Sequence, residues 1–321
     1  QAFYRLTPHV SAVINEHERL TGGGDDAYAE VAGQRTEFLR NRARRGGFFS
    51  PEAYFFVRTP PQTYRKQRLW EKADEFQTLT AQEYQDHRSR FERNLTQIES
   101  SLAHARLGPT RLKSTEWSAL LYEYFNHGRS EKIGPPAIRE ACSPFGEPLS
   151  GQLTLTDIEI HRDHLRIGDD LVRLLTLKTL PEGFSHASMV ESFLKLPFYF
   201  WLSQTILIPN QKREVEKLAL QRRLANSMAS GAKNVSDLES ESKLAHIETL
   251  MSELLEGSEK IVSTDYNVGI WAKNPDELEE KTDEVLKAFR SLNRSEGVAE
   301  THPLLEGYHK AEPGACALFR E

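Results

Sequence analysis

The chain has 321 residues, 38% of them hydrophobic and 27% charged, which excludes a disordered, low-complexity or collagen-like protein. Its formal net charge of −6 excludes a strongly basic nucleic-acid coat protein. Residues 1–113 contain 18 Lys and Arg against 14 Asp and Glu, whereas the remainder contains 23 against 33. Only the first part therefore has the sign that favours contact with phosphate or an anionic membrane.

Cysteine usage and hydropathy indicate a reducing compartment and no membrane span. Cys142 and Cys316 lie far apart and outside any CxxC pattern, so we expect ordinary thiols rather than a disulfide framework or a zinc site. The start at Gln1 lacks the pattern of a signal peptide. The most apolar stretch, residues 196–208, is too short to cross a bilayer. We expect a soluble or peripheral chain.

The first half is predicted to alternate short strands and amphipathic helices. The expected elements are a strand over 9–19, a helix over 26–45, a strand over 53–58, a long helix over 81–106 and a helix over 115–127. The helix over 26–45 places Tyr28, Val31, Phe38 and Leu39 on its apolar side. This half resembles a βαββαβ unit that lacks its first elements.

Gly and Pro residues crowd the segment before residue 151, which predicts a linker. We therefore expect a first, N-terminally incomplete α+β unit over 1–130, a linker over 131–150 and a second unit over 151–321.

The second half predicts strands over 152–160, 163–167, 171–180, 198–208, 260–272 and 296–302, with helices over 186–195, 211–229, 236–256 and 274–292. From residue 171 the order is the split βαβ, ferredoxin-like order with a helical hairpin inserted at its middle connection. The fold class predicted is α+β, with two ferredoxin-like (βαββαβ-type) units that carry helical insertions. The hairpin of the second unit is expected at about 211–256.

Catalytic signatures are absent from the sequence. There is no G-x-x-x-x-G-K-[ST] phosphate loop, and no GxSxG, HExxH or GxGxxG motif. His161 and His164 with Asp157, Glu159 and Asp163 favour solvated turn residues over a metal site, because residues three apart in a strand point to opposite faces. Asp169-Asp170 predicts a turn rather than a carboxylate dyad. We assign no catalytic, cofactor-binding or metal-binding residue.

Two candidate contact surfaces remain. The basic cluster of Arg40, Arg42, Arg44 and Arg45 ends a predicted helix; it is either a solvated helix end or a contact with anionic lipid or nucleic acid. The predicted hairpin carries an apolar stripe of Leu244, Ile247, Met251 and Leu254. That stripe either packs on its partner helix or contacts a neighbouring subunit.

The order of several segments resembles the N-terminal region of the type IV secretion and conjugation ATPases of the VirB/TrbE/CagE/TraC type. The segments are TEWSALLYEYFNHGRSEKIGPP (115–136), GQLTLTDIEIHRDHLRIGDDLVRLLTLKTLPEG (151–183), LPFYFWLSQTILIPNQKREVEKLALQRRLANSM (196–228) and THPLLEGYHKAEPGACALFRE (301–321).

The resemblance implies a cytoplasmic protein at the inner membrane, beneath a channel that transfers DNA or protein. It implies an N-terminal region that docks and oligomerises, followed by a RecA-like motor that binds ATP and Mg²⁺ and lies outside this sequence. Implied partners are further copies in a hexameric ring, inner-membrane secretion components and anionic lipid. A stand-alone interaction module and a nucleic-acid-contacting domain that binds DNA directly remain the alternatives.

Overall fold

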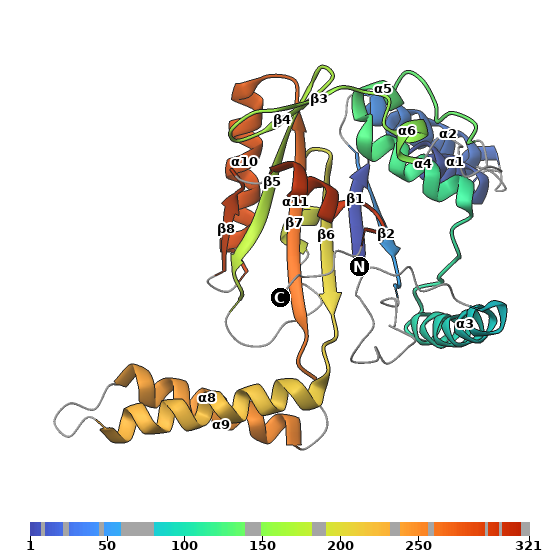
Figure 1. Ribbon diagram of the computed structural model, residues 1–321. Coiled ribbons are helices and arrows are strands. Elements are labelled where there is room, and N and C mark those ends of the chain that lie inside the picture. The colour runs from blue at the N-terminus through green and yellow to red at the C-terminus, as the bar shows by residue number, and fades with distance from the viewer. Residues whose placement is uncertain are drawn as a thin grey trace.

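The computed structural model describes residues 1–7, 10–21, 26–44, 48–58, 80–138, 149–181, 191–231, 238–255, 260–292, 295–301 and 304–315. Within these ranges one antiparallel sheet runs through the molecule, and a helical hairpin stands off one of its ends (Figure 1). This arrangement confirms the predicted α+β class.

The described part of the sheet has the strand order β2-β1-β6-β7-β5-β4-β3, and β8 also pairs with β5. β7 lies along one edge of β5, whereas β4 and β8 share the opposite edge at its two ends. The strands are β1 (Ala2–Thr7), β2 (Ser50–Phe55), β3 (Ile158–Ile160), β4 (Leu165–Ile167), β5 (Asp170–Thr179), β6 (Phe200–Leu207), β7 (Ser263–Ala272) and β8 (Glu296–Ala299).

Strands from both halves of the sequence belong to this sheet. β1 pairs with β2 on one side and with β6 on the other, so that Ala2 lies opposite Phe55 and Gln204. The predicted linker region therefore does not separate two sheets. In the second half, the strands lie in the order β6-β7-β5-β8.

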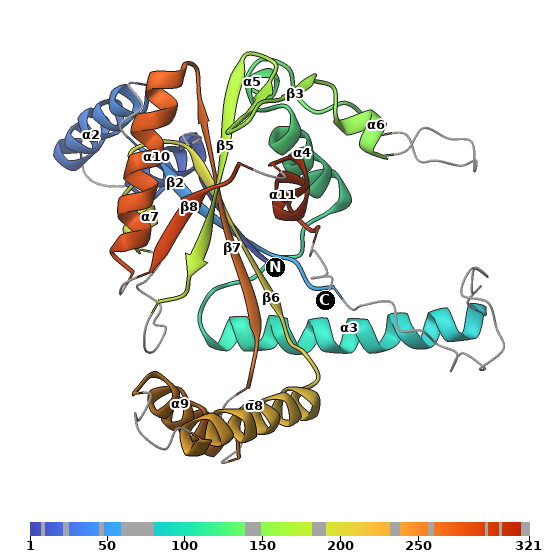
Figure 2. The same ribbon diagram turned by 60° about the vertical axis from the view of Figure 1, so that its left-hand side comes forward.

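Helices cover both faces of the sheet. Figure 2 shows α10 and α7 on one side and α4 and α11 on the other. The helices are α1 (Ser11–Thr21), α2 (Asp26–Arg44), α3 (Ala81–His104), α4 (Ser114–Phe125), α5 (His127–Ser130), α6 (Leu149–Leu153), α7 (Glu191–Leu194), α8 (Gln211–Gly231), α9 (Leu238–Leu255), α10 (Pro275–Arg290) and α11 (Leu304–Ala311).

The apolar run of β6 is buried on both faces because successive side chains point to opposite sides of a strand. Phe200 and Leu202 join the core beneath α7 and α10, whereas Trp201 joins the core beneath α4 and α11. Trp201 lies against Gly269 of β7, where a Cβ atom would be 2.2 Å from the indole ring. A side chain at position 269 would therefore displace the largest fully buried residue of the chain's described part.

Two tyrosines join α4 to α11 over this core. The rings of Tyr124 and Tyr308 stack with centroids 4.5 Å apart. The Tyr124 hydroxyl donates to the Tyr308 carbonyl at 2.7 Å, and the Tyr308 hydroxyl donates to the Tyr124 carbonyl at 2.5 Å. Both buried hydroxyls are thus hydrogen-bonded, as burial of a polar group requires.

Two local predictions are wrong, and one helix was not predicted. Residues 11–21 form helix α1 and not the predicted strand over 9–19; the strand is β1, just before it. Residues 149–153 form helix α6, so the predicted strand over 152–160 shortens to β3. α11 was not predicted, although its apolar residues Leu304, Tyr308 and Ala311 have helical spacing and are buried.

α3 lies beside the sheet with no buried residue among its 24. Its start agrees with the prediction, since Thr80 and Glu83 form a capping box. Arg111 on the segment that follows pairs with Glu92 and Glu99 along the helix. None of the described helices is long and apolar enough to cross a membrane.

Candidate docking and assembly surfaces

The two described side chains of the predicted basic cluster, Arg40 and Arg42, have different neighbours. The Arg40 guanidinium lies 2.6 Å from the Glu18 carboxylate, and so faces α1. The Arg42 guanidinium is exposed and lies 5.5 Å from the centroid of the Phe48 ring. The side chain of Arg44 and all of Arg45 lie outside the described residues. Membrane or partner contact through these four arginines stays a prediction.

A stripe of apolar and basic side chains along α2 is exposed. Tyr28, Val31 and Phe38, which the sequence places on the packing side, are 76%, 64% and 59% exposed. Exposed Arg35 and Arg42 alternate with them, which gives successive spacings of three and four residues along the helix. Such spacing places all five side chains on one stripe. We call these five residues the α2 stripe; their heptad-like spacing is the signal that could have identified it.

The helical hairpin forms where it was predicted. α8 and α9 lie between β6 and β7 in the sequence. They pack against each other and extend away from the end of the sheet (Figures 1 and 2). At its base the Gln211 amide nitrogen donates to the Ile261 carbonyl at 2.9 Å, and the Ile261 backbone nitrogen donates to the Gln211 amide oxygen at 2.9 Å. This pair of hydrogen bonds joins the start of α8 to the segment that leads into β7.

The predicted apolar stripe of α9 lies on its less exposed side. Leu244, Ile247, Met251 and Leu254 are half-buried, and α8 is the helix against which α9 packs. This placement fits the intramolecular reading, in which the stripe holds the hairpin together. Contact of these four residues with a neighbouring subunit stays a prediction.

The outward side of α8 was not singled out from the sequence. Leu220 and Leu224 are 57% and 52% exposed and lie one turn apart. Arg213 and Arg223 are exposed on the same side of the helix, by the 100° step between successive residues. The hairpin therefore presents to its surroundings leucines flanked by arginines, with the exposed Glu216 on the same side.

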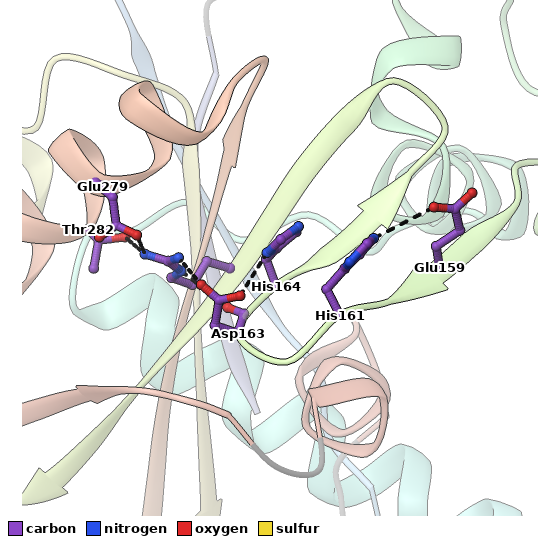
Figure 3. A network of polar contacts seen from close by, with 7 residues as sticks. Glu159, His161, Asp163, His164, Glu279 and Thr282 are labelled. Atoms are coloured by element: carbon purple, nitrogen blue, oxygen red, sulfur yellow. Dashed lines mark hydrogen bonds and ion pairs between the residues drawn. The ribbon is translucent and has the colours of Figure 1, made fainter.

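A polar network anchors the β3–β4 turn to α10 (Figure 3). Buried Arg173 of β5 lies 2.5 Å from an Asp163 oxygen and 2.9 Å from a Glu279 oxygen, and it donates to the Thr282 hydroxyl at 3.1 Å. Burial would raise the pKa of Asp163, but the hydrogen bond with His164 and the charge of Arg173 outweigh it and lower that pKa. The network holds together segments that are distant in the sequence.

His161 and His164 point the same way, and the prediction that they face opposite sides is wrong. Their rings stack with centroids 4.5 Å apart and planes inclined by 8°. The alternation rule fails because both residues belong to the turn between β3 and β4, not to a continuous strand. No three His, Cys, Asp or Glu side chains in the described ranges are grouped so that they could hold a metal ion.

Asp169 and Asp170 have different environments. Asp170 is buried and pairs with the Lys273 ammonium at 2.5 Å. Asp169 is exposed and lines a pocket of about 390 Å³, together with Gly128, Lys132 and Lys273. The two carboxylates therefore do not form a catalytic pair at one site. Cys142 and Cys316 both lie outside the described residues.

The family model described as TraC protein matches residues 1–293. The chain belongs to the TraC family. This match confirms the resemblance to the type IV conjugative transfer ATPases, of which TraC is one family. No curated protein matches the chain. Because the match covers both surfaces described above, α2 and the α8–α9 hairpin are parts of a TraC-family sequence and not additions to it.

Proposed function

We propose that this chain is the docking and assembly region of a conjugative transfer ATPase. In this role it holds copies of the protein together and connects an ATP-hydrolysing motor to the secretion channel. The observation that carries the proposal is the hairpin, which leaves the sheet between two neighbouring strands and presents exposed leucines and arginines. A projecting element with apolar and basic residues suits contact with a partner better than it suits packing within one chain.

ATP hydrolysis is assigned to a motor outside this sequence. The chain carries no phosphate loop, so its residues do not fit ATP and Mg²⁺, and we derive no catalytic step from them. The second half supports a coupling role, because its proposed ferredoxin-like order, β8-β5-β7-β6, forms a rigid sheet on which the hairpin is mounted. Motion of the motor can then reach the hairpin through packed strands.

The partners we propose are further copies in a hexameric ring and inner-membrane components of the secretion channel. The α2 stripe is the proposed contact with anionic lipid, since it combines aromatic side chains with arginines and contains no acid. The protein would then be peripheral at the cytoplasmic face of the inner membrane.

Excision of the hairpin tests the assembly role. Leu207 of β6 pairs directly with Ser263 of β7, so an Asn-Gly turn can replace residues 208–262 without disturbing the sheet. We expect the variant to fold and its number of copies per assembly, obtained by dividing the native mass from light scattering by the mass of its own chain, to fall below that of the unaltered chain.

Trp201 provides the folding control for this variant. Its side chain is fully buried on β6, the strand that leads into the excised segment, so blue-shifted tryptophan emission reports that the sheet is intact. An unchanged number of copies per assembly in the folded variant would contradict the assembly role of the hairpin.

A further inference from the structure

The outward side of α8 carries two exposed arginines. Arg213 and Arg223 have no acidic partner within ion-pair distance among the described residues, and the exposed Glu216 lies between them on the same side of the helix. The stretch from Arg213 to Arg223 covers about 15 Å of helix. Arginines without an ion-pair partner are complementary to a surface of opposite sign.

α10 carries the opposite charge on its solvent side. Asp276, Glu280 and Asp283 are exposed and project from its first half, and together they cover about 10 Å of helix. Glu279 projects on this side too, but it also pairs with Arg173. The opposite side of α10 packs on the sheet through Leu278, Val285 and Phe289, so the acidic side is fixed in orientation.

The two surfaces do not meet within one molecule. α10 lies along one face of the sheet, whereas the hairpin extends beyond the end of the sheet (Figures 1 and 2). Both surfaces are nevertheless present on each copy. A contact between them in neighbouring copies is heterologous, and heterologous contacts close into rings when the rotation between copies allows it.

We propose that the outward side of α8 of one copy binds the acidic side of α10 of the next copy. The inference rests on the proposed assembly role and names the surfaces that perform it. Arg213 and Arg223 approach opposite ends of the acidic stretch that contains Glu280 and Asp283, while Leu220 and Leu224 exclude water beside the charges. Exclusion of water strengthens the ion pairs and makes the contact depend on both its apolar and its charged residues.

Charge exchange tests this contact in the intact chain. The first variant is R213E/R223E, the second is E280K/D283K, and the third combines all four changes. We expect each of the first two to weaken self-association by about tenfold or more, because like charges then face each other. The combined variant, and an equimolar mixture of the first two, should associate nearly as well as the unaltered chain.

The matched control is R88E/R90E on α3, which makes the same change in net charge at exposed positions of another helix. It should associate normally, and sedimentation measures all six samples, the unaltered chain included. If the unaltered chain assembles but the two charge-reversed variants assemble equally well, or if the combined variant stays dissociated, the α8–α10 contact is wrong and the assembly role stands. If the unaltered chain is monomeric at every concentration, the assembly role itself is wrong.

Discussion

His127 lies where α4, α5 and the sheet meet. Its ring stacks on Tyr199 at 4.4 Å and lies 5.0 Å from the Trp271 ring, and its Nδ1 atom is buried without a hydrogen-bond partner among the described residues. Burial lowers the pKa of His127, although the nearby Asp170 carboxylate opposes that effect. The folded protein therefore holds this imidazole neutral at pH values where the unfolded chain protonates it.

The sign of the pH dependence follows from this difference. The stability linked to His127 is fully present above about pH 6.5, the ordinary histidine pKa, and is lost as the pH falls toward the lowered pKa of the folded state. In H127F the ring stack is kept and the titrating group is removed. We expect the loss of unfolding free energy between neutral and mildly acidic pH to become smaller in H127F.

Urea unfolding at a series of pH values measures this difference. Exposed His104 of α3 provides the matched control, since H104F removes a histidine that is outside the core. If the unfolding free energies of H127F and the unaltered chain changed equally with pH, the burial of His127 would have no effect on the pH dependence of stability.

At the scale of elements, α2 makes the proposed lipid contact testable. Lys and Arg near an anionic membrane surface contribute about 1 kcal/mol each, so R35E/R42E should weaken vesicle binding by about 30-fold or more. V31D/F38D should weaken it too, because the apolar residues of the α2 stripe would no longer enter the interface. Cosedimentation with phosphatidylglycerol-containing vesicles, compared with pure phosphatidylcholine vesicles, measures both effects.

The control for α2 comes from the segment that follows α3. L107D/L112D changes two exposed leucines that belong to neither proposed surface and should leave vesicle binding unchanged. If all variants cosedimented equally with the vesicles, the proposed lipid contact of the α2 stripe would be wrong.

Elements with complete local signals were predictable from sequence. α10 begins where expected because the Asn274 side chain accepts from the Glu277 backbone nitrogen at 2.9 Å and Pro275 occupies the first turn. α1 was mistaken for a strand because its apolar residues partly alternate. The burial of Val10 and Ile14 favours the helix instead. The exposure of the α2 stripe was not predictable, because periodicity identifies an apolar side without saying what covers it.

At the scale of the whole molecule, the unpredictable feature is the pairing of β1 with β6. Phe3 and Ser203 are 200 residues apart in the sequence and lie opposite each other in the sheet. Such a pairing depends on contacts between distant segments, which no local pattern encodes. Its consequence is that the segment carrying α2 and the strands carrying the α8–α9 hairpin join one sheet.

The assembly role is decided by conjugative transfer in cells whose only copy of this protein has residues 208–262 replaced by an Asn-Gly turn. We expect transfer to be lost while the protein stays folded and abundant, because the motor would no longer be held in its assembly. Transfer at the normal frequency, with the variant present at the normal level, would contradict an assembly role for this region.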